Sequence, residues 1–303
     1  SYTDVLVEFK DGNVVTLRKP ILKITDLAFG EMHPKTEFSA RVAPPMIGLG
    51  LLESISKETI LGFAEQQLAD KQGVSGKANY VLDVQTNDIT LGRFGWKAGQ
   101  PNLMQQNSAA FNGDLGLTSR LFPNENCTSA QSTCDDFPNG GEPEVSDNIL
   151  DFVEFYSQHL AVPIRRNVGN PVVVQGKKLF KDAGCQSCHQ AEFRTTEREG
   201  LPALSNQLIS PYTDMLLHDM GEGLADNRPE YLANGQEWRT TPLWGLGYTK
   251  EVSGHTFLLH DGRARNVMEA VLWHSGEAET AKQNVLALSR REREALLAFL
   301  NSL

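Results

Sequence analysis

The stretch LFKDAGCQSCHQAEF, residues 179–193, holds two of the four cysteines of this chain. Cys185 and Cys188 are separated by two residues, and His189 follows directly. Thiols at this spacing can reach the two vinyl groups on one edge of a porphyrin, and the next imidazole can then bind the iron. The pattern therefore predicts one covalent haem c in this chain, with His189 as the proximal iron ligand.

Other kinds of cysteine chemistry suit this motif less well. A zinc site needs four ligands, and the sequence has no second Cys/His pair with finger spacing. A thioredoxin-like redox pair would need a βαβ context, and a structural disulfide across two residues would be strained. The preceding stretch NPVVVQGKKLF instead predicts a helix, with Asn170 as N-cap and Pro171 at the first helical position.

The composition of the chain excludes several classes of partner. The 303 residues suffice for about two domains. A net charge of -10 makes nucleic acid and anionic membranes poor partners. No run of about 18 apolar residues predicts a membrane span, and no signal peptide is visible. The abrupt start at SYTDVLVEF suggests a processed product or a fragment.

The other two cysteines, Cys127 and Cys134, lie in the polar stretch NENCTSAQSTCDD. Their spacing can close a small disulfide loop at the surface, which would indicate an oxidising compartment. Two free thiols are the alternative, but exposed pairs of free thiols are reactive. We therefore expect a disulfide between Cys127 and Cys134.

The first half of the chain has few regular elements. Apolar alternation around Asp11-Gly12 predicts a β-hairpin over residues 4–20. Residues 54–67 have helical spacing, whereas residues 72–147 are rich in Gly, Asn, Asp, Ser and Thr and should be mostly loop. We expect residues 1–145 to form an inter-haem or partial first-domain region with a β-hairpin and irregular loops.

The second half has stronger helical signals. Ser146 is a predicted N-cap before an apolar-periodic stretch, and Ser289 with Glu292 predicts a capping box for the last helix. We therefore expect residues 146–303 to form a cytochrome-c-like helical haem domain with long loops. The expected fold class for the whole chain is mainly α.

A single haem also needs a sixth ligand or an open site on the iron. An isolated histidine or methionine is more often packed or exposed than bound to iron, so position alone does not choose between the candidates. Those candidates are Met215, His218, Met220, His255, His260 and His274.

Several long motifs carry a resemblance to a known family. They are RVAPPMIGLGLLESI (41–55), LGRFGWKAGQPNLMQQNSAAFNGDLGLTS (91–119), PYTDMLLHDMGEGLADNRPE (211–230), EWRTTPLWGLG (237–247) and HTFLLHDGRARNVMEAVLWHSGEAE (255–279). The chain resembles the di-haem oxidoreductase, putative peroxidase family, whose members are sometimes called thiol oxidoreductases. This family is a distant relative of the bacterial di-haem cytochrome c peroxidases and of the di-haem enzyme that matures methylamine dehydrogenase.

The resemblance implies a periplasmic protein with two haem domains, in which one haem transfers electrons and the other meets peroxide. Members of the family carry an earlier Cys-x-x-Cys-His motif, whereas this chain has one such motif. We therefore expect a C-terminal portion that lacks the first haem domain, and that missing N-terminal domain is an expected partner.

The resemblance also implies roles for individual residues. In the relatives, a His-Asp-Gly turn precedes the distal ligand of the C-terminal haem. Here that turn is His260-Asp261-Gly262, and the equivalent ligand position is His274. Met220, a loop methionine followed by glycine, is the runner-up from the sequence itself, and an open iron is the third alternative. Arg263 and Arg265 could pair with haem propionates, with exposed surface arginines as the alternative.

Two further features follow from the relatives and from the sequence itself. The turn RTTPL matches one whose carbonyls help hold calcium, so Thr240 and Pro242 could contribute to a Ca²⁺ site. Residues 100–110 align without gaps with residues 264–274, and this internal similarity places Ala110 opposite His274.

The resulting functional prediction is a periplasmic c-type haem oxidoreductase that is peroxidase-like in the intact di-haem protein. This chain would carry the electron-transfer haem, with an electron-donor protein or a small redox donor as partner, and its catalytic residues are unknown. The alternatives are an electron-transfer cytochrome c without peroxide chemistry, and a haem oxidase acting on a protein or small substrate.

Overall fold

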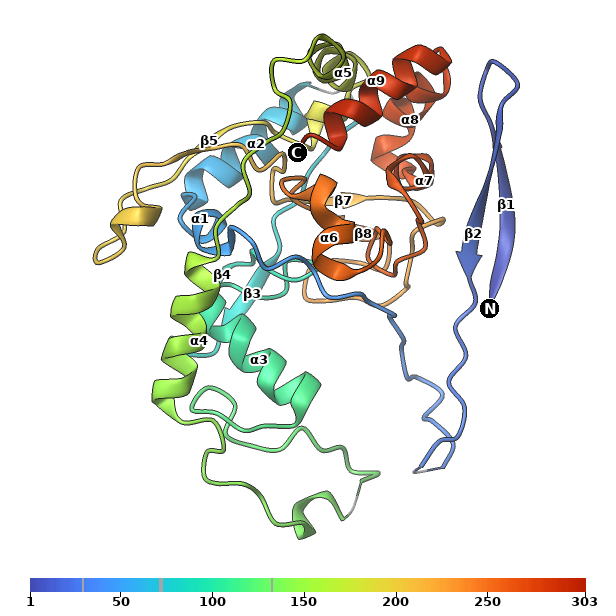
Figure 1. Ribbon diagram of the computed structural model, residues 1–303. Helices are drawn as coiled ribbons and strands as arrows, with labels where there is room; N and C mark the ends of the chain where they lie inside the picture. The colour runs from blue at the N-terminus through green and yellow to red at the C-terminus, as the bar shows by residue number, and fades with distance from the viewer. Residues whose placement is uncertain (29, 71–72, 132) are drawn as a thin grey trace.

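The computed structural model describes residues 1–28, 30–70, 73–131 and 133–303, in which short helices alternate with two-stranded sheets (Figure 1). The helices are α1 (Leu49–Glu53), α2 (Lys57–Asp70), α3 (Leu103–Leu115), α4 (Asp147–His159), α5 (Pro171–Asp182), α6 (Thr249–Ser253), α7 (Val267–Trp273), α8 (Glu279–Leu286) and α9 (Arg290–Leu300). The strands are β1 (Tyr2–Glu8), β2 (Val14–Pro20), β3 (Tyr80–Asp83), β4 (Asp88–Leu91), β5 (Phe193–Arg194), β6 (Leu208–Ile209), β7 (Leu217–Asp219) and β8 (Glu237–Arg239). Each strand pairs antiparallel with the next, as β1–β2, β3–β4, β5–β6 and β7–β8.

The prediction of a mainly α, cytochrome-c-like fold is wrong. The chain is 34% helical and 13% strand. Most of the difference lies between α5 and α6, where the chain forms loops, short strands and single helical turns. Five non-glycine residues in this segment have left-handed backbone conformations, which interrupt helices. They are Asn206, Tyr212, Met215, Asn227 and Tyr231.

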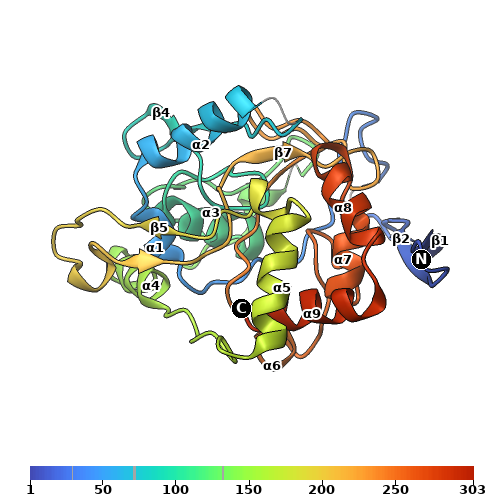
Figure 2. The same ribbon diagram turned by 90° about the horizontal axis from the view of Figure 1, so that it is seen from above.

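The predicted N-terminal hairpin is confirmed. β1 pairs with β2 in a register that places Val5 opposite Leu17, and Gly12 has the positive φ of 80° that the tight turn needs. Phe9 and Leu17 are buried in one hydrophobic cluster with residues of α7 and α8. The hairpin stands beside these helices in both views (Figures 1 and 2).

Helices α5 and α9 lie side by side and form the scaffold of the cysteine motif. Asn170 caps α5 by accepting a hydrogen bond from the Val172 N–H at 2.8 Å, and Ser289 with Glu292 forms the predicted capping box of α9. The two helices enclose a core of Val173, Phe180, Leu296, Phe299 and Leu300. Because α5 ends directly before Cys185, this packing fixes the position of the motif.

The close approach of α5 and α9 depends on Gly176. A Cβ atom there would lie 1.9 Å from the Ala295 backbone carbonyl oxygen. Gly176→Ala should therefore push the helices apart and lower the free energy of unfolding by about 1–3 kcal/mol. In α3, a methyl group at Gly113 would meet no heavy atom within 4 Å, so Gly113→Ala is the matched control and should be neutral or stabilising. Urea unfolding of both variants tests this, and equal destabilisation would contradict it.

The hydrophobic core is not divided at residue 145. One cluster combines Leu52, Leu103, Phe193, Leu216 and Trp244, which come from both sides of that position. The division into residues 1–145 and 146–303 stays a prediction. No helix in the described part of the chain is long and apolar enough to cross a membrane.

Candidate haem site

His189 is held in the orientation of a metal ligand. The motif follows α5 through Gly184, whose φ of 91° turns the chain into the single helical turn Cys185–Ser187. The Nδ1 atom of His189 lies 2.8 Å from the backbone carbonyl oxygen of Tyr212. A carbonyl can only accept, so Nδ1 carries the proton and Nε2 keeps its lone pair. Burial lowers the pKa of His189 to about 4, which keeps the imidazole neutral.

The imidazole of His274 is oriented in the same way, by a hydrogen bond from Nδ1 to a backbone carbonyl. His274 is the C-cap of α7, and its Nδ1 lies 2.7 Å from the backbone carbonyl oxygen of Ala270. Burial lowers its pKa as well, so this imidazole is also neutral with a free Nε2. The charge that His274 would carry makes a smaller contribution to the lowered pKa of His189.

The cysteines of the motif are half-buried and not joined to one another. Burial raises the pKa of Cys185 to about 12 and also raises the pKa of Cys188 above its ordinary value. Both are therefore neutral thiols at physiological pH.

A buried polar network surrounds Cys188, and no sequence motif indicated it. The His218 imidazole lies between two carboxylates, with Nε2 2.8 Å from Asp214 Oδ2 and Nδ1 2.7 Å from Glu277 Oε2. Cys188 Sγ is 3.6 Å from the same Nδ1. Gln67 Nε2 donates both to Asp214 and to the Ser187 carbonyl, each at 2.8 Å.

This network joins the two segments that carry the candidate iron ligands. Gln67 holds the motif loop, and Glu277 lies three residues after His274. Burial lowers the pKa of His218, but the carboxylate of Asp214 and the hydrogen bonds outweigh it, so the pKa is raised well above its ordinary value. Burial likewise raises the pKa of Glu277, yet the hydrogen bond from His218 brings it below the ordinary value.

A metal ion is a second interpretation of the same group. Ligand atoms of Cys188, Asp214 and His218 all lie within 4.8 Å of one another. A protonated imidazole with both nitrogens hydrogen-bonded to carboxylates has no lone pair for a metal. We therefore interpret the group as a hydrogen-bonded ion network.

Met220 and the two arginines already make contacts within the protein. The side chain of Met220 packs in the cluster around Trp273. Arg263 is buried, donates to Asp261 with Nη2 at 2.7 Å, and also donates to the Gly223 carbonyl. Arg265 donates to Glu269 and to a backbone carbonyl of β2. Propionate binding by these arginines stays a prediction. Protein acceptors already occupy Nε, Nη1 and Nη2 of Arg263 and Nε and Nη2 of Arg265.

The remaining predicted sites lie in loops. The Thr240 carbonyl accepts from Thr213 Oγ1 at 2.6 Å and from Arg239 Nη1 at 3.2 Å, so a cation would compete with a guanidinium for this oxygen. Pro242 follows two residues later and is half-buried.

Cys127 and Cys134 form a disulfide with a Cα–Cα distance of 6.2 Å, in the loop between α3 and α4.

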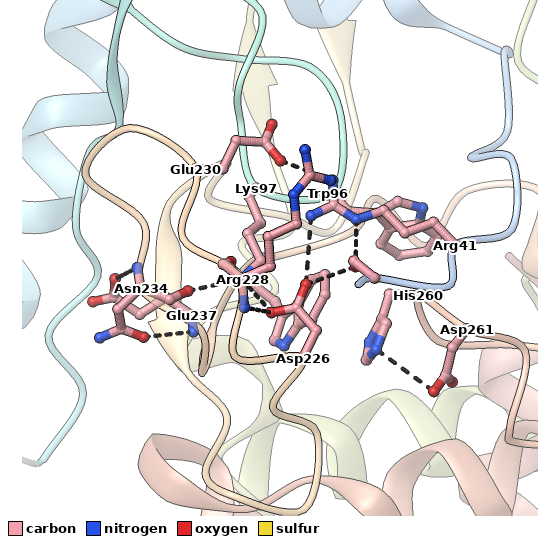
Figure 3. Close-up of polar contacts among 12 residues, drawn as sticks. Arg41, Trp96, Lys97, Asp226, Arg228, Glu230, Asn234, Glu237, His260 and Asp261 are labelled. Carbon is pink, nitrogen blue, oxygen red and sulfur yellow. Dashed lines mark hydrogen bonds and ion pairs between the residues drawn. The ribbon is translucent and has the colours of Figure 1, made fainter. Parts of the chain in front are cut away.

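A second buried group of polar and aromatic side chains lies around His260 (Figure 3). The His260 ring stacks on Trp238 with centroids 3.7 Å apart and meets Trp96 edge-on at 6.5 Å. Lys97 is fully buried, donates to Asp226 at 2.8 Å, and lies 4.4 Å from the centroid of the Trp238 ring. Burial lowers the pKa of His260 to about 4, so this candidate ligand is a neutral imidazole enclosed by indoles.

The loops before α3 and α7 are built alike. The backbone bridge between Phe94 and Gln100 has its counterpart between Leu258 and Ala264. Asn102 and Asn266 then cap α3 and α7 with the same side-chain hydrogen bond to the N–H three residues later. Positive φ angles also recur at matching positions, at Gly95 and Ala98 in one loop and at Leu259 and Gly262 in the other. The internal similarity seen in the sequence is therefore also present in the backbone.

Comparison with known proteins identifies the family of this chain. The family described as "Di-haem oxidoreductase, putative peroxidase" matches residues 1–303. The chain belongs to this di-haem oxidoreductase family. No curated protein matches it. Among solved structures, a chain of Kuenenia stuttgartiensis hydrazine synthase, determined under 20 bar of xenon, is similar at 15% identity over 94% of this chain and 99% of that chain, with a TM-score of 0.36. This likeness is too weak to carry a functional argument.

The donor set fits the haem that this di-haem oxidoreductase family implies. Two neutral thiols precede an imidazole with a free Nε2, and His274 is a second imidazole of the same kind. The indole Nε1 of Trp273, next to His274, is buried with no hydrogen-bond partner in the described structure, which leaves a donor for a bound group. The absence of a first haem domain stays a prediction, because the family match extends from the first residue.

Proposed function

We propose that this chain is a c-type haem oxidoreductase whose haem is bound covalently by Cys185 and Cys188, with His189 and His274 as axial ligands. The observation that carries the proposal is the matched pair of imidazoles. Both have Nδ1 committed to a backbone carbonyl, at 2.8 Å and 2.7 Å, and both keep Nε2 free. Fixing Nδ1 in this way orients a ligating histidine and selects its tautomer.

When bound, the haem supplies an iron that gains and loses one electron. The residues of the chain determine how it is held. Two histidine ligands leave no open coordination position, so this site favours electron transfer over peroxide binding. The network of Asp214, His218 and Glu277 keeps the two ligand-bearing segments together.

The peroxidase part of the proposal concerns the intact di-haem protein. The loop-helix unit that ends at His274 is repeated around α3, where Ala110 occupies the equivalent position. Alanine cannot bind iron, so a haem placed against α3 would keep one side open for peroxide. An electron-donor protein or small redox donor would supply this chain. Haem attachment to a Cys-x-x-Cys-His motif and the loop disulfide both support export to the periplasm.

His274→Ala tests the axial ligand. The wild-type ferric protein should show a low-spin bis-histidine spectrum, and the variant should lose nearly all of that signal and bind added imidazole. Electron paramagnetic resonance and optical spectra measure the change. Met220→Leu is the control, because Met220 packs among apolar side chains and its loss should leave the low-spin signal unchanged. The reverse pattern would assign the distal ligand to Met220.

The number of haems per chain tests the rest of the proposal. A pyridine haemochrome assay on exported protein should give one haem for this chain. Peroxide turnover with a reduced donor should require the intact di-haem protein. If this single-haem chain turned over peroxide as fast as the intact protein, the division of roles would be wrong.

A further inference from the structure

The surface beside the cysteine motif contains a hollow of about 290 Å³. Its floor includes the apolar side chains of Val174 and Ala191 and the rings of Phe180 and Tyr212. Gln186, which lies between the two cysteines of the motif, forms part of the wall. The hollow therefore opens next to the residues that would attach the haem.

The floor of the hollow contacts the proximal ligand directly. The Tyr212 carbonyl accepts the hydrogen bond from His189, and the Phe180 ring centroid lies 6.2 Å from that of the imidazole. A molecule seated in the hollow would thus be one residue away from the iron ligand.

Lysines give the rim of the hollow a positive charge. Lys177, Lys178 and Lys181 are exposed on α5 and line it. Lys178 pairs with Asp182, whereas no ion pair is found for Lys177 or Lys181 within the described residues. The chain as a whole carries a net charge of -10, so this rim is opposite in sign to the average surface. Glu192 directly follows the lining residue Ala191 and adds a negative charge near the hollow.

We propose that this lysine-rimmed hollow is the docking surface for an acidic electron-carrier protein. The inference rests on the proposed function, because the hollow matters only if His189 binds a haem. An apolar floor with a mainly positive rim is suited to brief, oriented contact, in which opposite charges speed association and the apolar centre excludes water. A basic partner would be repelled by the lysines, although it would be attracted by most of the remaining surface.

The double variant Lys177→Glu, Lys181→Glu tests the surface with a plant-type ferredoxin as the acidic probe. At low ionic strength, the dissociation constant of the variant for ferredoxin, measured by surface plasmon resonance, should be about tenfold or more above that of the wild type. Stopped-flow oxidation of the reduced protein gives a second measurement. The rate with anionic hexacyanoferrate(III) should fall about tenfold, and the rate with cationic tris(phenanthroline)cobalt(III) should rise.

Two further variants control for overall charge. The control double variant Lys19→Glu, Lys23→Glu changes the net charge by the same amount. These residues lie on and beside the N-terminal hairpin, away from α5 (Figures 1 and 2), so this variant should weaken ferredoxin binding much less. Glu192→Gln should tighten ferredoxin binding. If both lysine double variants weakened ferredoxin binding equally, the proposal would be overturned. It would also be overturned if the wild-type protein were a dimer that the Lys177→Glu, Lys181→Glu variant dissociates, since a second copy of the chain would then occupy the hollow.

Failure of this inference is distinguishable from failure of the proposed function. Ferredoxin binding requires no haem and can be measured on the chain whether or not the cofactor is attached. If haem-loaded wild-type protein bound ferredoxin no more tightly than the Lys177→Glu, Lys181→Glu variant does, only the docking surface would be refuted. A protein without covalent haem would refute the proposed function whatever the binding result.

Discussion

Replacing both Cys185 and Cys188 by alanine should abolish covalent haem in the exported protein. Each thioether bond needs one of these thiols, and the other two cysteines are joined in a disulfide far along the chain. His189 and His274 remain in the variant, so some haem can still bind, but acidified organic solvent should extract all of it. Intact-protein mass spectrometry should find wild-type protein heavier by one haem and the variant with the mass of its polypeptide.

The matched control changes the other pair of cysteines. Cys127→Ser, Cys134→Ser should keep the covalent haem, while the loss of a small disulfide loop lowers the free energy of unfolding by about 2 kcal/mol. If wild-type protein exported with an active haem-attachment apparatus were colourless and had only its polypeptide mass, the haem assignment would be refuted. If the Cys127 and Cys134 changes removed haem equally, the effect would come from folding.

Local sequence signals predicted the local structure well. The hairpin at residues 4–20, the Asn170 cap of α5 and the capping box at Ser289 are all present, because each depends on residues a few positions apart. The apolar periodicity from residue 146 gave the right helix, α4. It did not show which face is buried, since Leu150 is inside while Phe152 is 73% exposed.

The fold class failed for a different reason. A haem motif after a helix suggested a helical cytochrome domain, but the 66 positions between α5 and α6 follow tertiary contacts that no periodic pattern records. β7, for example, pairs with β8 and also bridges to Lys77 in the first half of the chain. Pairings between such distant positions leave little trace in a single sequence.

The candidate site was predictable only where a motif exists. Cys185, Cys188 and His189 are adjacent in the sequence, and His274 was reached through the family resemblance. The network around Cys188 was not predictable, because His218 is 30 residues from Cys188 and 59 from Glu277. The one local signal was the four-residue spacing of Asp214 and His218, which in a loop segment indicates nothing by itself.

The same network gives the second large expected effect, on stability. Asp214 is fully buried and accepts hydrogen bonds from Gln67, His218 and the Leu216 N–H. Asp214→Ala leaves a buried imidazolium with one carboxylate and removes one of the two acceptors of the Gln67 amide nitrogen. Removing one partner of a buried ion pair costs about 3–5 kcal/mol, and denaturant unfolding at pH 6 should show a loss of this size.

Lys178→Ala is the matched control for Asp214→Ala. The Lys178–Asp182 ion pair is exposed, with side-chain exposures of 76% and 50%, so its loss should cost less than about 1 kcal/mol. Equal losses in the two variants would contradict the role of the buried network in holding the motif loop. An intact haem spectrum in Asp214→Ala, despite the lower stability, would limit that role to folding.

The pH dependence of the same network tests the charge on His218. Its pKa is raised in the folded protein, so its contribution to stability is fully present below the unfolded value of about 6.5 and is lost as the pH rises through the folded value. The difference in unfolding free energy between wild type and His218→Gln should therefore be largest near pH 6 and shrink in alkaline solution. If this difference in unfolding free energy instead grew with pH, the His218 imidazole would be neutral in the folded protein. A metal site formed by Cys188, Asp214 and His218 would then again be a candidate.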